Sequence, residues 1–179
     1  MHTSNKTIAK NTLFLYARML IVMAVTLYTS RMILEILGVS DYGLYNVVGG
    51  IVTMLSFVNG ALSVSTSRFL TYELGKRNKE KLNQTFSASL SLHFLLALLV
   101  LFLGETVGLW FFYEKLVIPA DRLQAAFWVY QFSILTTMVS FTQVPYNASL
   151  IAHENMSIYA YVGLYEAFSR LLIVFLLQI

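Results

Sequence analysis

Charged side chains inside apolar stretches are the residues of this sequence with the clearest chemical potential. Arg18 lies within an apolar run that continues from Leu13 to about Leu37, and Arg68 stands near the end of the next apolar run. A charge in the centre of a bilayer is costly, so such residues usually mark a substrate or ion pathway or a buried partner. A long arginine side chain near a helix end can instead reach the interface. Both interpretations stay open for Arg18, whereas the interfacial one is favoured for Arg68.

Two pairs of opposite charges have helical spacing. Glu166 precedes Arg170 by four residues, and Arg31 precedes Glu35 by four. Residues four apart lie on one face of a helix, so each pair can form an ion pair. Pairing would lower the cost of placing Glu166 and Arg170 in a membrane, and both a structural and a functional role fit that pattern. Arg31 is expected to anchor an interface.

A polar stripe of Thr136, Ser140, Gln143 and Asn147 lies beside Pro145. A proline inside a helix removes one backbone hydrogen bond and kinks the helix. The freed carbonyl, next to amide side chains, could bind an ion or a sugar. The stripe could equally satisfy the kinked backbone. Gln143 and Asn147 are therefore candidate substrate-binding residues.

Small residues recur at spacings of four and three in the second apolar run: Gly49, Thr53, Ser56, Gly60, Ser63 and Ser67. Such a seam lets two helices approach closely and lets hydroxyls bond across the interface. It could also line a water-filled or head-group-binding cavity. His93 is a lone histidine near Ser89, and we expect it to be a hydrogen-bonded packing residue rather than a proton relay.

The sequence holds no enzyme signature. It contains no Walker A glycine loop, no HExxH and no GxSxG motif. Acidic residues with metal-ligand spacing are missing, the three histidines are far apart, and the cysteine count is zero. We therefore expect no catalytic activity, no metal or other cofactor, and no nucleic-acid partner.

Composition places these residues in a membrane. Hydrophobic residues make up 58% of the chain, charged residues 12%, and the mean hydropathy is +0.69. A soluble domain has about 45–50% apolar and about 25% charged residues. We expect an all-α membrane protein with a single transmembrane domain over residues 1–179, truncated because the apolar run still continues at Ile179. The expected helices cover about 8–37, 42–72, 80–112, 121–152 and 157–179.

Charge distribution orients these helices. The densest cluster of basic residues lies in Glu73–Gln84, and the N-terminal tail also carries lysines. Short loops rich in Lys and Arg stay on the cytoplasmic side, so we expect the N-terminus inside. The turn after the first helix, where Gly38 ends one helix and Ser40 or Asp41 caps the next, then lies outside. We expect the aromatic run Trp110–Tyr113 to form a belt at the outer interface.

The segment Leu37–Tyr45, LGVSDYGLY, follows a first helix that opens Lys10-Asn11-Thr12 and resembles the N-terminal part of bacterial polysaccharide flippases. These are the Wzx or RfbX-like transporters of the multidrug/oligosaccharidyl-lipid/polysaccharide exporter superfamily. Ile118–Arg122 before the fourth helix and Val144–Glu154 closing it match the same family. The similarity runs over nearly the whole chain and suits a lipid-linked sugar exporter better than a drug exporter.

The resemblance implies two similar helical bundles that rock around a central, often cationic cavity, of which this chain would be part of the first. It implies translocation of an undecaprenyl-pyrophosphate-linked oligosaccharide across the bacterial inner membrane for polysaccharide or lipopolysaccharide (O-antigen) biosynthesis. The implied partners are that substrate, membrane lipids and other glycan-assembly membrane proteins. Arg18 stands where the family can present cationic cavity residues, and planar guanidinium donors pair bidentately with phosphate. Arg68 and Arg170 are secondary candidates.

Two other functions fit the same sequence. One is a drug or ion antiporter of the wider superfamily. The other is a non-transporting scaffold for the glycan-assembly machinery, which would tolerate loss of the charges inside the membrane, whereas a transporter would not. A membrane-embedded glycan polymerase is disfavoured because the outer loops are short.

Overall fold

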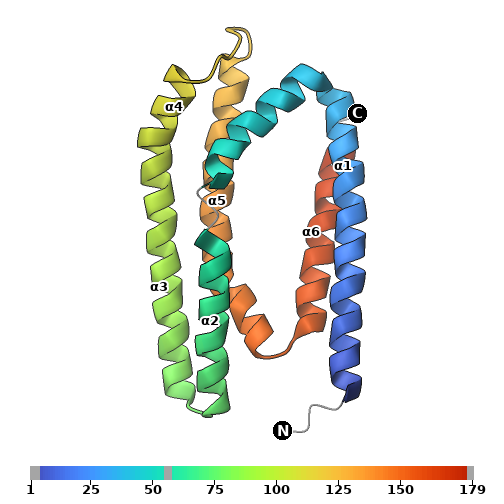
Figure 1. Ribbon diagram of the computed structural model, residues 1–179, viewed down its shortest axis with the longest axis vertical. Coiled ribbons are helices and arrows are strands. Elements are labelled where there is room, and N and C mark those ends of the chain that lie inside the picture. The colour runs from blue at the N-terminus through green and yellow to red at the C-terminus, as the bar shows by residue number, and fades with distance from the viewer. Residues whose placement is uncertain (1–4, 55–57, 177–179) are drawn as a thin grey trace. The chain divides into compact units, whose positions relative to one another are not determined.

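The computed structural model describes residues 5–54 and 58–176, and every regular element in them is helical (Figure 1). The elements are α1 Asn5–Met54, α2 Val58–Gly75, α3 Lys79–Leu103, the π-helical segment η2 Gly104–Gly108, α4 Leu109–Glu114, α5 Leu123–Ala152 and α6 Met156–Leu176. Because α3, η2 and α4 are continuous, the described part of the chain forms five helices. The expected all-α class is confirmed.

The helices divide into two compact units. Unit 1 combines residues up to Tyr42 with those from Glu154 onward, and unit 2 is Gly43–His153. In unit 1, α1 and α6 run in the same direction, since Phe14 contacts Tyr161 and Tyr28 contacts Phe175 through their rings (Figure 1). In unit 2, α2, α3 and α5 pack against one another.

Gly38 interrupts α1. Its φ of 74° and ψ of 169° are non-helical, while the helix continues on both sides. Glycine adopts this conformation readily because it has no Cβ. The sequence predicts a break of several residues here, but Ser40 and Asp41 are helical, so the break narrows to one residue. The helix predicted over 42–72 therefore begins within α1 and continues in α2, and its residues 55–57 lie outside the described residues.

Alanine in place of Gly38 is expected to lower the free energy of unfolding by about 1–3 kcal/mol, the cost of holding an L-residue in that backbone region. Steric crowding plays no part, because a Cβ at Gly38 would meet nothing within 4 Å. Gly43→Ala is the matched control: its Cβ is equally free, but its backbone is helical. Alanine there is expected to stabilise by about 0.5–1 kcal/mol. Unfolding by SDS in mixed micelles measures both, and equal effects would contradict the conformation of Gly38.

The GxxxG pair Gly104 and Gly108 lies in the π-helical segment η2. The Tyr130 hydroxyl of α5 donates a hydrogen bond to the Gly104 carbonyl at 2.6 Å. A Cβ at Gly108 would overlap that hydroxyl, and a Cβ at Gly104 would lie 2.8 Å from Cδ1 of Ile134. The close approach of α5 to η2 therefore requires glycine at both positions.

A hydrophobic core surrounds Tyr130 in unit 2. Its buried members are Val48, Val52, Phe112, Ala126, Tyr130 and Ile134. The Phe112 ring lies 5.4 Å from the Tyr130 ring, centroid to centroid, and is fully buried. The structure thus corrects the prediction that Phe112 belongs to an interfacial belt, because the ring packs against α5. The neighbouring Trp110, Phe111 and Tyr113 are exposed.

Three of the described helices are long and apolar enough to cross a membrane. By length and composition these are Ala9–Met54, Lys79–Glu114 and Met156–Leu176. They suggest a multi-pass membrane protein. The helix α5 is 30 residues long but, like α2, falls below this apolar level because of its polar side chains. That all five helices span the membrane stays a prediction.

Candidate functional site

Arg18 lies on the face of α1 that contacts α6 within unit 1. Its guanidinium carbon is 4.4 Å from the centroid of the Tyr159 ring. A Cβ at Gly163 would overlap the same guanidinium, so the arginine occupies space that a larger residue would fill. Tyr159 and Gly163 are four residues apart and therefore share one face of α6. Together the two residues form a seat for the Arg18 head group.

The Arg18 guanidinium is held by the ring rather than by a carboxylate. A cation over an aromatic face is attracted by the ring quadrupole, worth about 0.5–2 kcal/mol. The Nε atom of Arg18 is buried and has no hydrogen-bond partner among the described residues. None of the ion pairs formed by the described residues includes Arg18. The positive charge of Arg18 is therefore not neutralised by a carboxylate of the described residues.

Arg18 is half-buried, and its neighbours on α1 and α6 are mostly apolar. The buried residues of α6 are Ala160, Gly163, Ala167 and Val174, mostly small side chains that allow close helix approach. Ring contacts flank the arginine in both directions along α1, with centroid distances of 6.3 Å for Phe14–Tyr161 and 6.3 Å for Tyr28–Phe175. An unpaired cation in such a setting is costly, because apolar neighbours cannot replace its hydration.

The other two arginines described in unit 1 have carboxylate partners. Arg31 Nε lies 2.8 Å from Glu35 Oε1, and Arg170 Nη2 lies 3.1 Å from Glu166 Oε1. Both predicted pairs are confirmed. Their side chains are mostly exposed in this chain, between 55% and 77%. Arg18 is thus distinguished from its neighbours by its lack of a counter-charge within the described residues.

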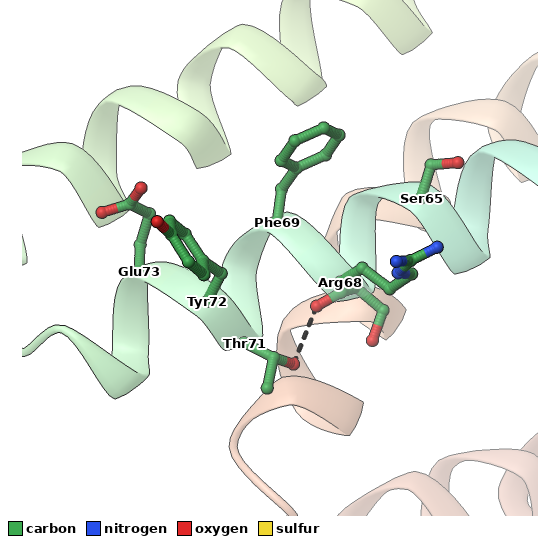
Figure 2. A pocket seen from close by; sticks show the side chains of 7 residues that line it. Ser65, Arg68, Phe69, Thr71, Tyr72 and Glu73 are labelled. Atoms are coloured by element: carbon green, nitrogen blue, oxygen red, sulfur yellow. Dashed lines mark hydrogen bonds between the residues drawn. The ribbon is translucent and has the colours of Figure 1, made fainter.

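Arg68 lies on α2, in unit 2. It lines a pocket along that helix with Ser65, Phe69, Thr71, Tyr72 and Glu73 (Figure 2). Figure 2 shows the guanidinium of Arg68 pointing away from the Glu73 carboxylate. One turn beyond Tyr72, the Lys76 amine lies 4.2 Å from the tyrosine ring centroid, and a hydrogen bond to the Tyr72 side chain raises the pKa of Lys76. Lys76, which follows Arg68 by eight residues, therefore stays cationic.

Gln143 and Asn147 flank Pro145 on α5, as the sequence predicts. Pro145 is inside the helix and buried, Gln143 is exposed, and Asn147 is half-buried. His93 on α3 is fully buried, and its Nδ1 lies 2.7 Å from the Ser89 carbonyl oxygen. The hydrogen bond and the burial agree with a packing role, whereas Nε2 of the same ring is buried without a hydrogen-bond partner among the described residues.

The predicted site residues are distributed over both units. Arg18, Glu166 and Arg170 belong to unit 1, whereas Arg68, Gln143 and Asn147 belong to unit 2. Within unit 1, Glu166 follows Gly163 by three residues but pairs with Arg170 rather than with Arg18. The contact of Arg18 with Tyr159 and Gly163 could not be predicted from the sequence. The Tyr159 and Gly163 spacing marks a helix face, but nothing in the sequence links that face to Arg18.

Comparisons of the chain with family models, with curated proteins and with solved structures find no match. The resemblance to polysaccharide flippases therefore stays a prediction from the sequence motifs. The structure itself supports an all-α chain of five helices in its described part, with three candidate transmembrane helices.

Proposed function

We propose that this chain forms part of the first helical bundle of a transporter that moves an undecaprenyl-pyrophosphate-linked oligosaccharide across the bacterial inner membrane. The observation that carries the proposal is that Arg18 has no counter-charge in the described part of the chain. Its guanidinium lies in an apolar candidate span, is stacked on Tyr159, and has no carboxylate partner among the described residues. A cation placed there is costly unless an anion offsets it. The pyrophosphate of the substrate is such an anion.

The geometry of Arg18 suits a phosphate ligand. The guanidinium is planar and presents several donors that match two phosphate oxygens at once. Contact with the Tyr159 ring and with Gly163 restricts the side chain before the substrate arrives. Such preorganisation reduces the entropy lost on binding. Arg170 is a weaker ligand, because Glu166 already engages it.

Further contacts are proposed on unit 2. Arg68, beside the basic loop, would attract the substrate phosphates at the cytoplasmic interface. Gln143 and Asn147 would hydrogen-bond the sugars, since amides both donate and accept. These roles follow from side-chain type and from the exposure of Arg68 and Gln143.

The proposed topology has five transmembrane helices and a cytoplasmic N-terminus. The parallel course of α1 and α6 supports it, because an odd number of crossings between two spans gives them the same direction. The basic residues after α2 support a cytoplasmic position for that loop. The protein would then be a multi-pass inner-membrane protein.

The unpaired charge of Arg18 also argues against the two alternative functions, a drug exporter and a scaffold. An exporter of cationic drugs would be hindered by an unpaired cation in its first helix, because like charges repel in a low dielectric. A scaffold would have no use for it. Transport of an anionic substrate is therefore favoured over drug export and over a scaffold role. No catalytic role is proposed.

Binding of undecaprenyl pyrophosphate to the purified chain tests the proposal, with native mass spectrometry as the readout. Arg18→Gln is expected to weaken binding at least about tenfold, the effect of losing one charge-assisted contact. Arg31→Gln is the matched control, since Arg31 is exposed and paired with Glu35, and should change binding less than about twofold. Undecaprenol, which lacks the charge, should bind both variants like the wild type. Equal binding of undecaprenyl pyrophosphate to Arg18→Gln and wild type would refute the assignment.

A further inference from the structure

A pocket of about 490 Å³, with both polar and apolar side chains in its walls, lies between the last turns of α1 and the middle of α5, within unit 2. Its walls include Tyr45, Asn46 and Thr53 of α1 and Phe132, Ser133 and Thr136 of α5. This volume falls within the range of about 300–1,000 Å³ found for small-ligand sites. Among the described residues, no charged side chain lines the pocket.

The pocket joins two polar stripes that are separate in the sequence. Gly49 and Thr53 belong to the seam of small residues, and Thr136 begins the stripe on α5. A Cβ at Gly49 would lie 3.8 Å from Oγ of Ser133, so the two helices are close at this point. The seam therefore lines a cavity at Gly49 and Thr53, while its member Ser56 lies outside the described residues.

The hydroxyls of the pocket are arranged as acceptors. Thr53, Ser133 and Thr136 each donate to a carbonyl three or four residues earlier in their own helix, at 2.7–2.9 Å. A hydroxyl that has used its proton in this way keeps lone pairs on its oxygen. The amide of Asn46 can accept and donate. The pocket thus offers several acceptors to the hydroxyl groups of a ligand.

Two aromatic rings complete the walls. Tyr45 is 46% exposed and Phe132 is 61% exposed, so both rings remain open to a ligand. The face of an aromatic ring carries partial negative charge and attracts the weakly positive hydrogens of C–H bonds. A saturated ring that carries C–H bonds on one face and hydroxyl groups on its rim matches both kinds of wall.

We propose that this pocket binds an uncharged sugar ring, with its C–H face against Phe132, the more exposed of the two rings, and its hydroxyls on Thr53 and Thr136. An anionic ligand is disfavoured, because the walls present acceptors and no cation. The inference deepens the proposed function, and it rests on that function only for the source of the sugar, the glycan of a lipid-linked oligosaccharide.

Saturation-transfer NMR on the purified chain tests the site, with methyl α-D-galactopyranoside and N-acetylglucosamine as probes. The detergent must carry no sugar, so an amine oxide is used. Wild-type protein is expected to transfer saturation to the ring protons. Thr136→Val and Phe132→Leu should each reduce the transfer about fivefold, the size expected for one lost contact. Because the Phe132 side chain is largely exposed, its replacement should leave helicity and thermal unfolding unchanged.

Thr142→Val is the matched control. Thr142 also lies on α5 and donates to a carbonyl of its own helix at 2.7 Å, but it is not on the pocket wall. This variant should transfer saturation like the wild type. No transfer in the wild type, or equal transfer in Phe132→Leu, would overturn the inference. Binding of tetraphenylphosphonium without binding of sugars would also overturn it, by assigning the pocket to a hydrophobic cation.

The sugar site and the phosphate site can fail separately. The sugar probes carry neither phosphate nor lipid, so Arg18→Gln is expected to leave their saturation transfer unchanged. Sugar binding with no effect of Arg18→Gln on undecaprenyl pyrophosphate would support the pocket and refute the proposed phosphate ligand. The reverse result would refute the pocket alone.

Discussion

Replacing Tyr130 by alanine is expected to lower the free energy of unfolding by about 3–5 kcal/mol, the usual cost of deleting a buried aromatic side chain. Tyr130 is fully buried, and its ring lies 5.4 Å from the Phe112 ring in the core of unit 2. The substitution also removes the 2.6 Å hydrogen bond to the Gly104 carbonyl in η2. Unfolding by SDS in mixed micelles, followed by circular dichroism, measures the loss.

Two further substitutions separate the ring from the hydroxyl. Tyr130→Phe keeps the ring and leaves the Gly104 carbonyl without this donor, so it should cost about 1–2 kcal/mol. Tyr165→Ala is the control for an exposed tyrosine, since Tyr165 is 76% exposed, and should cost less than about 0.5 kcal/mol. If Tyr130→Ala cost no more than Tyr165→Ala, Tyr130 would not be the centre of this core.

The all-α class could be predicted from the sequence because each apolar run is long enough to form a span and is bounded by turn residues. Gly38 also marked the first break correctly, since its backbone conformation favours glycine. The continuation of α1 beyond it could not be predicted, because a break of one residue needs no polar loop. The role of Gly104 and Gly108 was hidden for a different reason. A GxxxG pattern is typical of close helix packing in general, and only the position of Tyr130 shows what packs there.

In the candidate site too, contacts within one helix could be predicted from the sequence, whereas contacts between helices could not. Arg31–Glu35 and Glu166–Arg170 could be predicted because a spacing of four residues on a helix brings side chains together. The contact of Arg18 with Tyr159 could not, because it depends on how α6 docks on α1. The walls of the sugar pocket were only half visible. Their hydroxyls form stripes in the sequence, whereas Tyr45 and Phe132 look like ordinary lipid-facing aromatics until the two helices are placed together.

Leucine in place of Gly163 is expected to lower the free energy of unfolding by about 1–2 kcal/mol, the worth of the contact between the Arg18 guanidinium and the Tyr159 ring. Even a Cβ at this position would overlap the Arg18 guanidinium, so the larger side chain must displace it. The guanidinium is the end of a flexible side chain and can move away, so the loss is that of the ring contact. Gly60→Leu is the control, because a Cβ at Gly60 meets nothing within 4 Å. It should cost less than about 0.5 kcal/mol.

A double substitution identifies the cause of this loss. In an Arg18→Ala background the guanidinium is gone, so Gly163→Leu is expected to cost less than about 0.5 kcal/mol. The two substitutions should therefore be non-additive by about 1 kcal/mol, as expected for residues in direct contact. Arg18→Ala and Gly60→Leu should be additive, since Gly60 has no such neighbour. Additive behaviour of Arg18→Ala with Gly163→Leu would contradict the position of Arg18 over Gly163, and the case for a preorganised phosphate ligand would fall with it.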